Sequence, residues 1–254
     1  MKYISKYPHG IMFHHFHNFK NFKKSQGSIS SNQFKKIIKL IGRKNILNAD
    51  EFLKLYQKRK IKNNHVCLTF DDGLKCQVNI ALPILKKFKI KAFWFLYTSI
   101  FKNKYDSLEI FREFRHSFKT INEFYKEFFF LTKNIKKKIN KNKLNLFIKN
   151  NKKKFPFYSE NDLKFRYYRD EILKKDYKKI MKQMIKKFNF DVNACSKRIF
   201  ISKEDLFSLN RNNQLIGLHT HTHPTNINKL SLSQSKEEYK KNKEILGRML
   251  KKNI

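Results

Sequence analysis

Glycine and proline are scarce in this sequence, with six and four residues in a chain of 254. This scarcity excludes a collagen-like protein, a proline-rich linker and a small β-protein rich in turns. By contrast, 40% of the residues are hydrophobic and 15% are aromatic, whereas chains that stay unfolded are poor in both types. We therefore expect a folded protein built from helices and a modest number of strands.

Cysteine and long apolar runs are also rare. Cys67, Cys76 and Cys195 form no CxxC pair, which argues against a disulfide framework and against a cysteine zinc site. The first twenty residues contain no apolar run of the roughly 7–15 residues that a signal peptide needs. No window reaches the ~18 uninterrupted apolar residues of a membrane span. We expect a soluble protein in the reducing cytoplasm, without a membrane span.

Acidic residues are few: 20 Asp and Glu face 58 Lys and Arg, which gives a formal net charge of +38. Such a charge is typical of proteins that bind nucleic acid or an anionic membrane. However, 49 of these cations are Lys and only nine are Arg, whose planar fork binds phosphates and guanine edges. We therefore interpret the charge as solvated surface and expect no nucleic-acid partner. The alternative, an RNA- or DNA-binding protein, predicts binding that weakens steeply with salt and is unaffected by chelators.

Helix and strand signals alternate over the first hundred residues. Short apolar runs rich in β-branched and aromatic residues predict strands at 11–16, 66–70 and 91–97. Ser30 and Gln33 form a capping-box pattern that begins a helix ending near Gly42. Asn48 begins a second helix, and residues 74–88 predict a third. Strands separated by helices indicate a parallel sheet, whose functional groups gather at the carboxyl ends of the strands.

Residues 101–197 differ in composition, with Lys, Phe, Tyr and Asn in abundance, one proline and no glycine. Apolar and basic residues alternate there at roughly helical spacing, which predicts a helical insertion. The insertion could pack on the sheet, act as a lid or offer a face to a partner. It could also attach to a membrane surface through its Lys and Phe residues.

The pattern of strands and helices resumes after the insertion. Residues 198–201 and 215–219 predict strands, Ser202 begins a helix that runs to about 210, and Ser231 with Gln234 begins a final helix. We find no internal repeat. We expect one catalytic domain over residues 1–254.

Two clusters of polar residues follow predicted strands. The first is Asp71-Asp72-Gly73, which is also a favourable turn sequence, and the second contains His219, His221 and His223. His219 and His223 are four residues apart and can share one face of a helix or a strand. One carboxylate with two imidazoles is a known facial ligand set, and a metal in such a set activates water. The clusters together predict hydrolysis of an amide or ester.

The segments TFDDG and HTxxH resemble the first two motifs of the polysaccharide deacetylase family, whose catalytic unit is the NodB-homology domain. The resemblance implies that Asp71 is the general base and that Asp72, His219 and His223 bind one divalent metal, most often zinc. It implies that His221 is not a ligand and that Thr220 supports the histidine loop. The implied fold is a distorted, incomplete (β/α) barrel.

A cytoplasmic subgroup encoded with surface-polysaccharide biosynthesis is similar in GIMFHHFH, CLTFDDGL and AFWFLY. The family's later motifs, an Arg-Pro segment, an Asp-Trp segment and a Leu-x-x-His that supplies the general acid, are missing, and no His follows His223. The domain therefore looks truncated at its carboxyl end. His14, His15 or His17 could supply the acid; we assign His14 to catalysis and His15 with Thr220 to substrate binding.

The resemblance implies a metal-dependent hydrolase that removes acetyl from an N-acetylated sugar, as a polysaccharide, an oligosaccharide or a sugar precursor. Cobalt, nickel and manganese also suit the ligand set that favours zinc. One alternative is a catalytically inactive or split-gene fragment, which would associate with a separately encoded carboxyl-terminal half or with itself. A deformylase or an O-acetyl esterase acting on a sugar would use the same groups, so both activities stay open.

Overall fold

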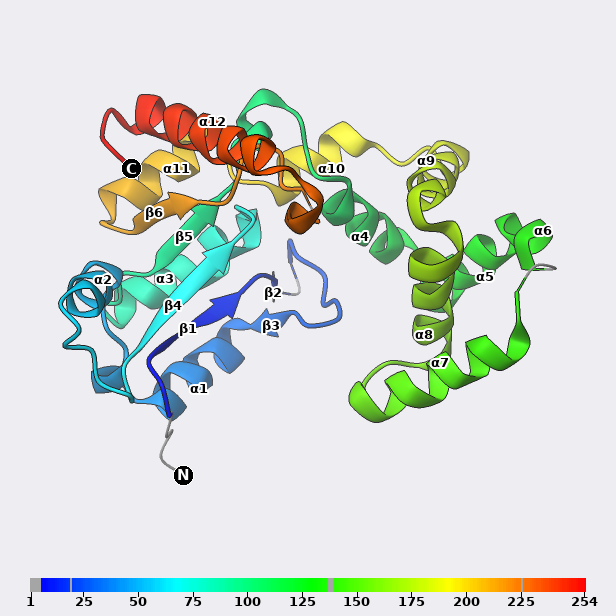
Figure 1. The fold of residues 1–254 in the computed structure, drawn as a ribbon, viewed down its shortest axis with the longest axis horizontal. Helices are drawn as coiled ribbons and strands as arrows, with labels where there is room; N and C mark the ends of the chain where they lie inside the picture. Colours follow the sequence, from blue (N-terminus) through cyan, green and yellow to red (C-terminus); the bar gives the residue numbers. More distant parts are fainter. Residues whose placement is uncertain (1–5, 19, 137–138, 225) are drawn as a thin grey trace. The chain divides into compact units, whose positions relative to one another are not determined.

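A four-stranded parallel sheet, in the order β1-β4-β5-β6, organises the first of the two units into which the chain divides (Figure 1). The computed structural model describes residues 6–18, 20–136, 139–224 and 226–254. The first unit comprises Met1–Asp106 and Asn193–Ile254, and the second comprises Ser107–Val192.

Each strand of the sheet is parallel to its neighbours. The strands are β1 (His9–Phe13), β4 (Val66–Asp71), β5 (Phe93–Leu96) and β6 (Leu215–Leu218). This arrangement confirms the α/β class, and the open order, with β1 and β6 outermost in the described part of the chain, is consistent with an incomplete barrel. Because parallel strands end at the same edge, the residues after β1, β4 and β6 lie close together.

The strand predicted at 11–16 is interrupted. β1 ends at Phe13, and β2 (Phe16–His17) pairs instead with β3 (Ile29–Ser30) in a separate two-stranded sheet. The rings of Phe13 and Phe16 both pack on Phe34, with centroids 5.0 and 5.3 Å away. In one continuous strand, side chains three residues apart point to opposite faces, so this shared packing requires a break between the two.

Several helix starts are confirmed in detail. Both predicted capping boxes, Ser30 with Gln33 and Ser231 with Gln234, are present. Asn48 precedes the second helix, but its side chain accepts a hydrogen bond from the Lys91 backbone rather than capping that helix. The helical segments of this unit are α1 (Ser31–Ile41), η1 (Arg43–Asn45), α2 (Ala49–Gln57), the π-helical η2 (Gln77–Ala81), α3 (Leu82–Lys87), η3 (Ser99–Lys102), α10 (Val192–Ile199), α11 (Lys203–Arg211), η6 (Ile227–Lys229) and α12 (Leu232–Leu250).

The strand predicted at 198–201 is wrong. α10 extends to Ile199, and Phe200 makes only an isolated antiparallel bridge with Leu74. Phe200 is buried, and its ring contacts those of Tyr97 and Tyr105, at 6.1 and 5.2 Å. Ile199, Phe200 and Ile201 are all buried, and a buried apolar run this short looks the same in sequence whether it ends a helix or forms a strand.

The second unit is helical, which confirms the helical character predicted for the insertion. Its segments are α4 (Ser107–Ser117), α5 (Ile121–Leu131), α6 (Lys133–Lys136), α7 (Lys141–Lys154), α8 (Glu160–Tyr167), η4 (Tyr168–Leu173), η5 (Lys174–Asp176) and α9 (Tyr177–Lys187). Its own core contains Phe114, Phe128, Phe165 and Met181. The assignment of residues 1–254 to one catalytic domain stays a prediction. Among the described residues, no helix combines the length and hydropathy that a bilayer span requires.

Candidate metal centre and active site

Asp71 and Asp72 lie at the end of β4, where the chain turns toward η2. Asp72 and Gly73 both have positive φ, 72° and 64°, and a residue other than glycine rarely adopts such a conformation. The buried Gln77 side chain braces this turn by donating to the backbone oxygens of Asp71 at 2.6 Å and of His14 at 2.9 Å. Gln77 therefore fixes the end of β1 beside the end of β4.

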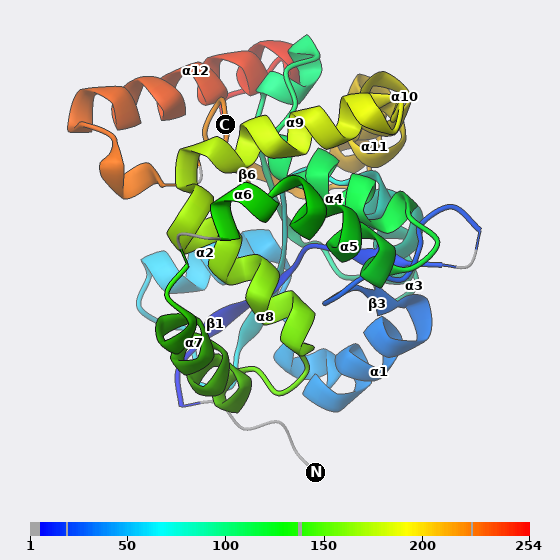
Figure 2. The ribbon, with the colours of Figure 1, turned by 90° about the vertical axis from the view of Figure 1, so that its right-hand side faces the viewer.

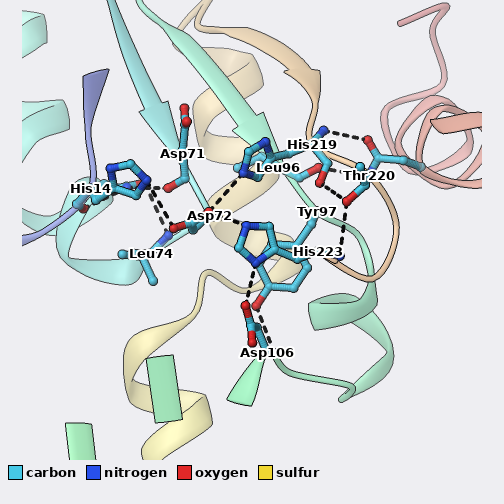
Figure 3. A network of polar contacts seen from close by, with 12 residues as sticks. His14, Asp71, Asp72, Leu74, Leu96, Tyr97, Asp106, His219, Thr220 and His223 are labelled. Atoms are coloured by element: carbon cyan, nitrogen blue, oxygen red, sulfur yellow. Dashed lines mark hydrogen bonds and ion pairs between the residues drawn. The ribbon is translucent and has the colours of Figure 1, made fainter. Parts of the chain in front are cut away.

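His219 and His223 follow β6, and both side chains point toward Asp72, on the side opposite His14 (Figure 3). The Asp72 Oδ1 atom lies 3.1 Å from His219 Nε2 and 3.2 Å from His223 Nε2. One ligand atom from each of the three residues lies within 4.8 Å of the other two. Two imidazole nitrogens and one carboxylate oxygen converging on one point are a donor set that suits a divalent transition metal such as zinc. The residues present therefore fit the implied metal.

Of the three histidines considered as the acid, His14 lies beside this group. Its Nε2 atom is 3.5 Å from Asp72 Oδ2, and its side chain is 33% exposed. The ring of His15 stacks on that of His14, with centroids 6.0 Å apart. His17 is buried and pairs with Ser28 through Nδ1 at 2.9 Å.

Asp106 is a residue of the site that the sequence did not reveal. Its Oδ2 atom lies 2.6 Å from His223 Nδ1, so His223 presents Nδ1 to Asp106 and Nε2 to Asp72. Metal-binding histidines commonly donate their second ring N–H to a carboxylate in this way. The Tyr97 ring stacks on His223 at 5.0 Å, and its hydroxyl accepts the Asp106 backbone N–H at 3.3 Å. Asp106 lies in the segment after β5 and η3. This position beyond the end of a strand is the only feature of the sequence that could have indicated a role for Asp106 in the site.

The charges of the site are set by burial and by these contacts. Burial alone would raise the pKa of Asp72, but hydrogen bonds from His219 and His223 outweigh it and hold that pKa far below its ordinary value. Burial would lower the pKa of His223, yet Asp106 and Asp72 raise it to about 10 in the metal-free protein. Burial raises the pKa of Asp71. The Asp71 Oδ1 atom is buried without a hydrogen-bond partner among the described residues.

Glu238 of α12 holds the loop that carries the histidines. Its carboxylate accepts the backbone N–H groups of His221 at 2.8 Å and of Thr222 at 2.7 Å, and also the Thr222 hydroxyl at 2.8 Å. His221 lies outside the Asp72 group, and its Nδ1 atom is 2.9 Å from Thr98 Oγ1. Burial and the charge of Lys241 lower the pKa of His221.

Asn242, one turn further along α12, ties the same loop to β5. Its Oδ1 atom accepts the His219 backbone N–H at 3.1 Å, and its Nδ2 atom donates to the Leu96 oxygen at 2.9 Å. The side chain is fully buried. Sequence reasoning identified neither Glu238 nor Asn242, because neither belongs to a motif near the histidines.

Thr220 makes its hydrogen bonds within the loop. Its hydroxyl donates to the His219 oxygen at 2.5 Å and accepts the His223 N–H at 3.2 Å. Thr220 and His223 both have positive φ, 65° and 56°, and a β-branched residue is rarely found there. These bonds brace a strained loop whose turn brings His219 and His223 together. A direct role of Thr220 in substrate binding stays a prediction.

One solved structure of similar fold is a deacetylase. The chain is similar to the deacetylase PplD from Streptococcus pyogenes, determined in complex with acetate, with 14% identity and a TM-score of 0.52 over 99% of this chain and 72% of that one. A polysaccharide deacetylase from Bacillus cereus has 15% identity and a TM-score of 0.48, covering 98% of this chain and 49% of that one. IcaB from Ammonifex degensii has 21% identity and a TM-score of 0.30, covering 37% of this chain and 39% of that one.

No curated protein sequence gives a significant match to this chain. The polysaccharide deacetylase family model matches residues 58–254, a span that contains Asp71, Asp72, His219 and His223. This span is more than half of the chain, and the similarity to PplD shows the same fold. The chain therefore belongs to the polysaccharide deacetylase family.

Proposed function

We propose that this chain is a metal-dependent deacetylase that hydrolyses the acetamide group of an N-acetylated sugar in the cytoplasm. The family consists of hydrolases that act on carbon–nitrogen bonds. The observation that carries the proposal is the convergence of His219 Nε2 and His223 Nε2 on Asp72 Oδ1, at 3.1 and 3.2 Å. The three cysteines are buried and form no disulfide, which fits a reducing compartment.

Asp72, His219 and His223 are proposed to hold one divalent cation, with zinc favoured by the imidazole and carboxylate donors. When bound, such an ion supplies Lewis-acid chemistry, because it polarises a carbonyl oxygen and makes water more acidic. Asp106 would keep the Nδ1 proton of His223 in place, so that Nε2 stays available as a ligand.

Asp71 is proposed as the general base. Its buried Oδ1 atom has no hydrogen-bond partner among the described residues, and burial raises its pKa, so this carboxylate is a stronger proton acceptor than an exposed one. It would take a proton from the attacking water while the water oxygen bonds to the carbonyl carbon. The carbon–nitrogen bond then breaks to give acetate and a free amine.

His14 is proposed as the acid that protonates the departing amine. It lies 3.5 Å from Asp72 and is one-third exposed, so it borders the cluster and can also meet a bound substrate. His15, stacked on His14, is proposed to contact the sugar together with Thr220.

Acetate release from defined sugars tests the proposal. The purified chain, loaded with zinc, would be incubated with a chitooligosaccharide and a nucleotide-linked acetylamino sugar, and acetate would be followed by proton NMR. N-formyl and O-acetyl sugars in parallel distinguish a deformylase and an esterase from a deacetylase. We expect chelator-sensitive acetate release that Asp71→Asn abolishes. Zinc binding without release from any of these substrates would contradict the proposed activity.

A further inference from the structure

Helix α7 and the turn that follows it, residues 155–158, form one continuous basic and apolar edge of the helical unit, which we call the α7 edge. Over residues 141–158 the sequence has six Lys and no Asp or Glu. The next acidic residue is Glu160, the first residue of α8. All charged side chains of this edge are therefore lysines.

Large apolar side chains stand in solvent on the same edge. Phe157 is 67% exposed, Leu146 is 59% exposed and Phe155 is 42% exposed. No residue of α7 is fully buried. The inner side of α7 packs on α8 (Figure 1 and Figure 2). The Phe147 ring lies 5.2 Å from that of Tyr167. The exposed apolar side chains therefore lie outside the contact between the two helices. Their exposure to water is unfavourable in free energy.

The turn has a defined conformation. The Phe157 and Tyr158 rings lie 4.6 Å apart, and the Phe155 ring lies 5.7 Å from that of Tyr158. The Lys152 ammonium donates to the Tyr158 backbone oxygen at 2.5 Å, and the Arg166 guanidinium lies over the Tyr158 ring at 4.0 Å. Tyr158 is thus fixed from within the unit, and Phe155 and Phe157 are presented beside Lys152–154.

We propose that the α7 edge binds the surface of an anionic lipid bilayer. Aromatic side chains enter the boundary between headgroups and acyl chains, while adjacent lysines interact with anionic headgroups. Phe155 and Phe157 are the inserting residues, and Lys152–154 are the headgroup-binding residues. The protein would lie on the membrane without spanning it.

A bilayer fits this edge better than a nucleic acid does. Its cations over 141–158 are all lysines, which act as point charges, and it lacks the arginine forks that bind phosphate bidentately. Exposed phenylalanines gain little from a hydrated polyanion, whereas they are removed from water in a lipid interface. The inference concerns a surface of the second unit and is independent of the deacetylase proposal.

Cosedimentation of the full chain with lipid vesicles tests the inference. Vesicles of phosphatidylcholine alone and of phosphatidylcholine with one-third phosphatidylglycerol would be compared at low and high salt. We expect binding to the anionic vesicles and at least tenfold weaker binding to the neutral ones. Phe155→Ser with Phe157→Ser should weaken binding at least tenfold. Lys152→Gln, Lys153→Gln and Lys154→Gln together should weaken it on the order of a hundredfold, about fivefold for each lysine.

Matched controls come from exposed residues of α12. Lys236→Gln, Lys240→Gln and Lys243→Gln remove the same charge elsewhere, and Leu232→Ser with Tyr239→Ser removes apolar surface elsewhere; each should change binding less than threefold. Circular dichroism checks that all variants fold. Absence of binding to anionic vesicles, equal loss in the control triple, or unchanged binding after the two Phe substitutions would overturn the inference. Binding of the Phe variants to poly-U and to anionic vesicles would also be compared. If the Phe variants bind both as well as the parent does, the binding is a general attraction to polyanions and the inference is overturned.

Discussion

Asp106 and His223 are in direct polar contact at the candidate metal centre, with Oδ2 and Nδ1 2.6 Å apart although the residues are 117 positions apart in the chain. The other ring nitrogen of His223 faces Asp72 at 3.2 Å. The imidazole of His223 thus contacts the supporting carboxylate of Asp106 through one nitrogen and the proposed ligand Asp72 through the other. Removing the supporting carboxylate should therefore weaken metal binding without removing a ligand.

Asp106→Asn keeps the side-chain shape but removes the negative charge that holds the Nδ1 proton. We expect zinc affinity to fall about 10- to 100-fold, as for other carboxylates that orient metal-binding histidines. Competition with a chromophoric chelator measures this loss. Asp50→Asn, which changes an exposed carboxylate on α2, is the matched control and should bind zinc like the parent. An affinity for Asp106→Asn within twofold of the parent would rule out the positioning role.

Metal affinity should rise with pH across the neutral range. Asp106 and Asp72 raise the pKa of His223 to about 10 in the metal-free protein, so below that pH the ring carries a proton that a metal must displace. Zinc affinity should increase by up to tenfold for each pH unit between about 6 and 9. Calorimetry in buffers of different ionisation enthalpy should detect close to one proton released per zinc. A pH-independent affinity without proton release would show that His223 does not bind the metal.

Glu238 should stabilise the histidine loop. Burial would raise the pKa of Glu238, but hydrogen bonds from the backbone and side chain of Thr222 and from His221 hold that pKa below its ordinary value. Its stabilising effect is therefore fully present above the unfolded-state pKa near 4.5 and is lost as pH falls through the lower folded-state value. Glu238→Gln should lower the free energy of unfolding by about 1–2 kcal/mol at pH 7, measured with urea.

Glu237, the exposed neighbour of Glu238, provides the control for the unfolding measurement. Glu237→Gln removes the same charge from α12 and should change the unfolding free energy by less than about 0.5 kcal/mol. The difference between the two variants should shrink toward pH 3. Equal stability of the two variants at pH 7 would mean that the Glu238 bonds to the loop contribute nothing to folding.

His14 should act in the reaction and not in metal binding. His14→Asn should retain zinc affinity within about threefold and lose 10²- to 10⁴-fold in kcat, the usual contribution of an acid or base. His17→Asn, which changes the histidine paired with Ser28, is a control for altered folding of the same segment. An unchanged kcat for His14→Asn would require another acid.

Local patterns in the sequence predicted local structure well. The capping boxes at Ser30 and Ser231 are hydrogen bonds between residues three positions apart, so the sequence contains both partners side by side. The sequence motifs correctly placed Asp71 and Asp72 at the end of one strand, and His219 and His223 after the end of another. The break after Phe13 was not predictable, because it depends on how Phe13 and Phe16 share contact with Phe34.

Contacts between residues far apart in the chain could not be predicted from the sequence. Asp106 is an ordinary acidic residue until the fold brings it to His223, and Gln77 becomes a brace only when β1 and β4 end side by side. Glu238 lies on a helix with many charged residues, and its bonds to the loop depend on how α12 packs near β6. These three contacts are tertiary, so no spacing along the chain indicates them.

Acetate release during a zinc titration tests the central claim most directly. Metal-free parent protein would receive increasing zinc at fixed concentration of an N-acetylated sugar, with His219→Ala and His221→Ala measured in parallel. We predict that release appears with zinc, saturates at about one equivalent in the parent and in His221→Ala, and is lost in His219→Ala. Full release from the metal-free parent, or equal loss in the two histidine variants, would contradict a metal centre built on Asp72, His219 and His223.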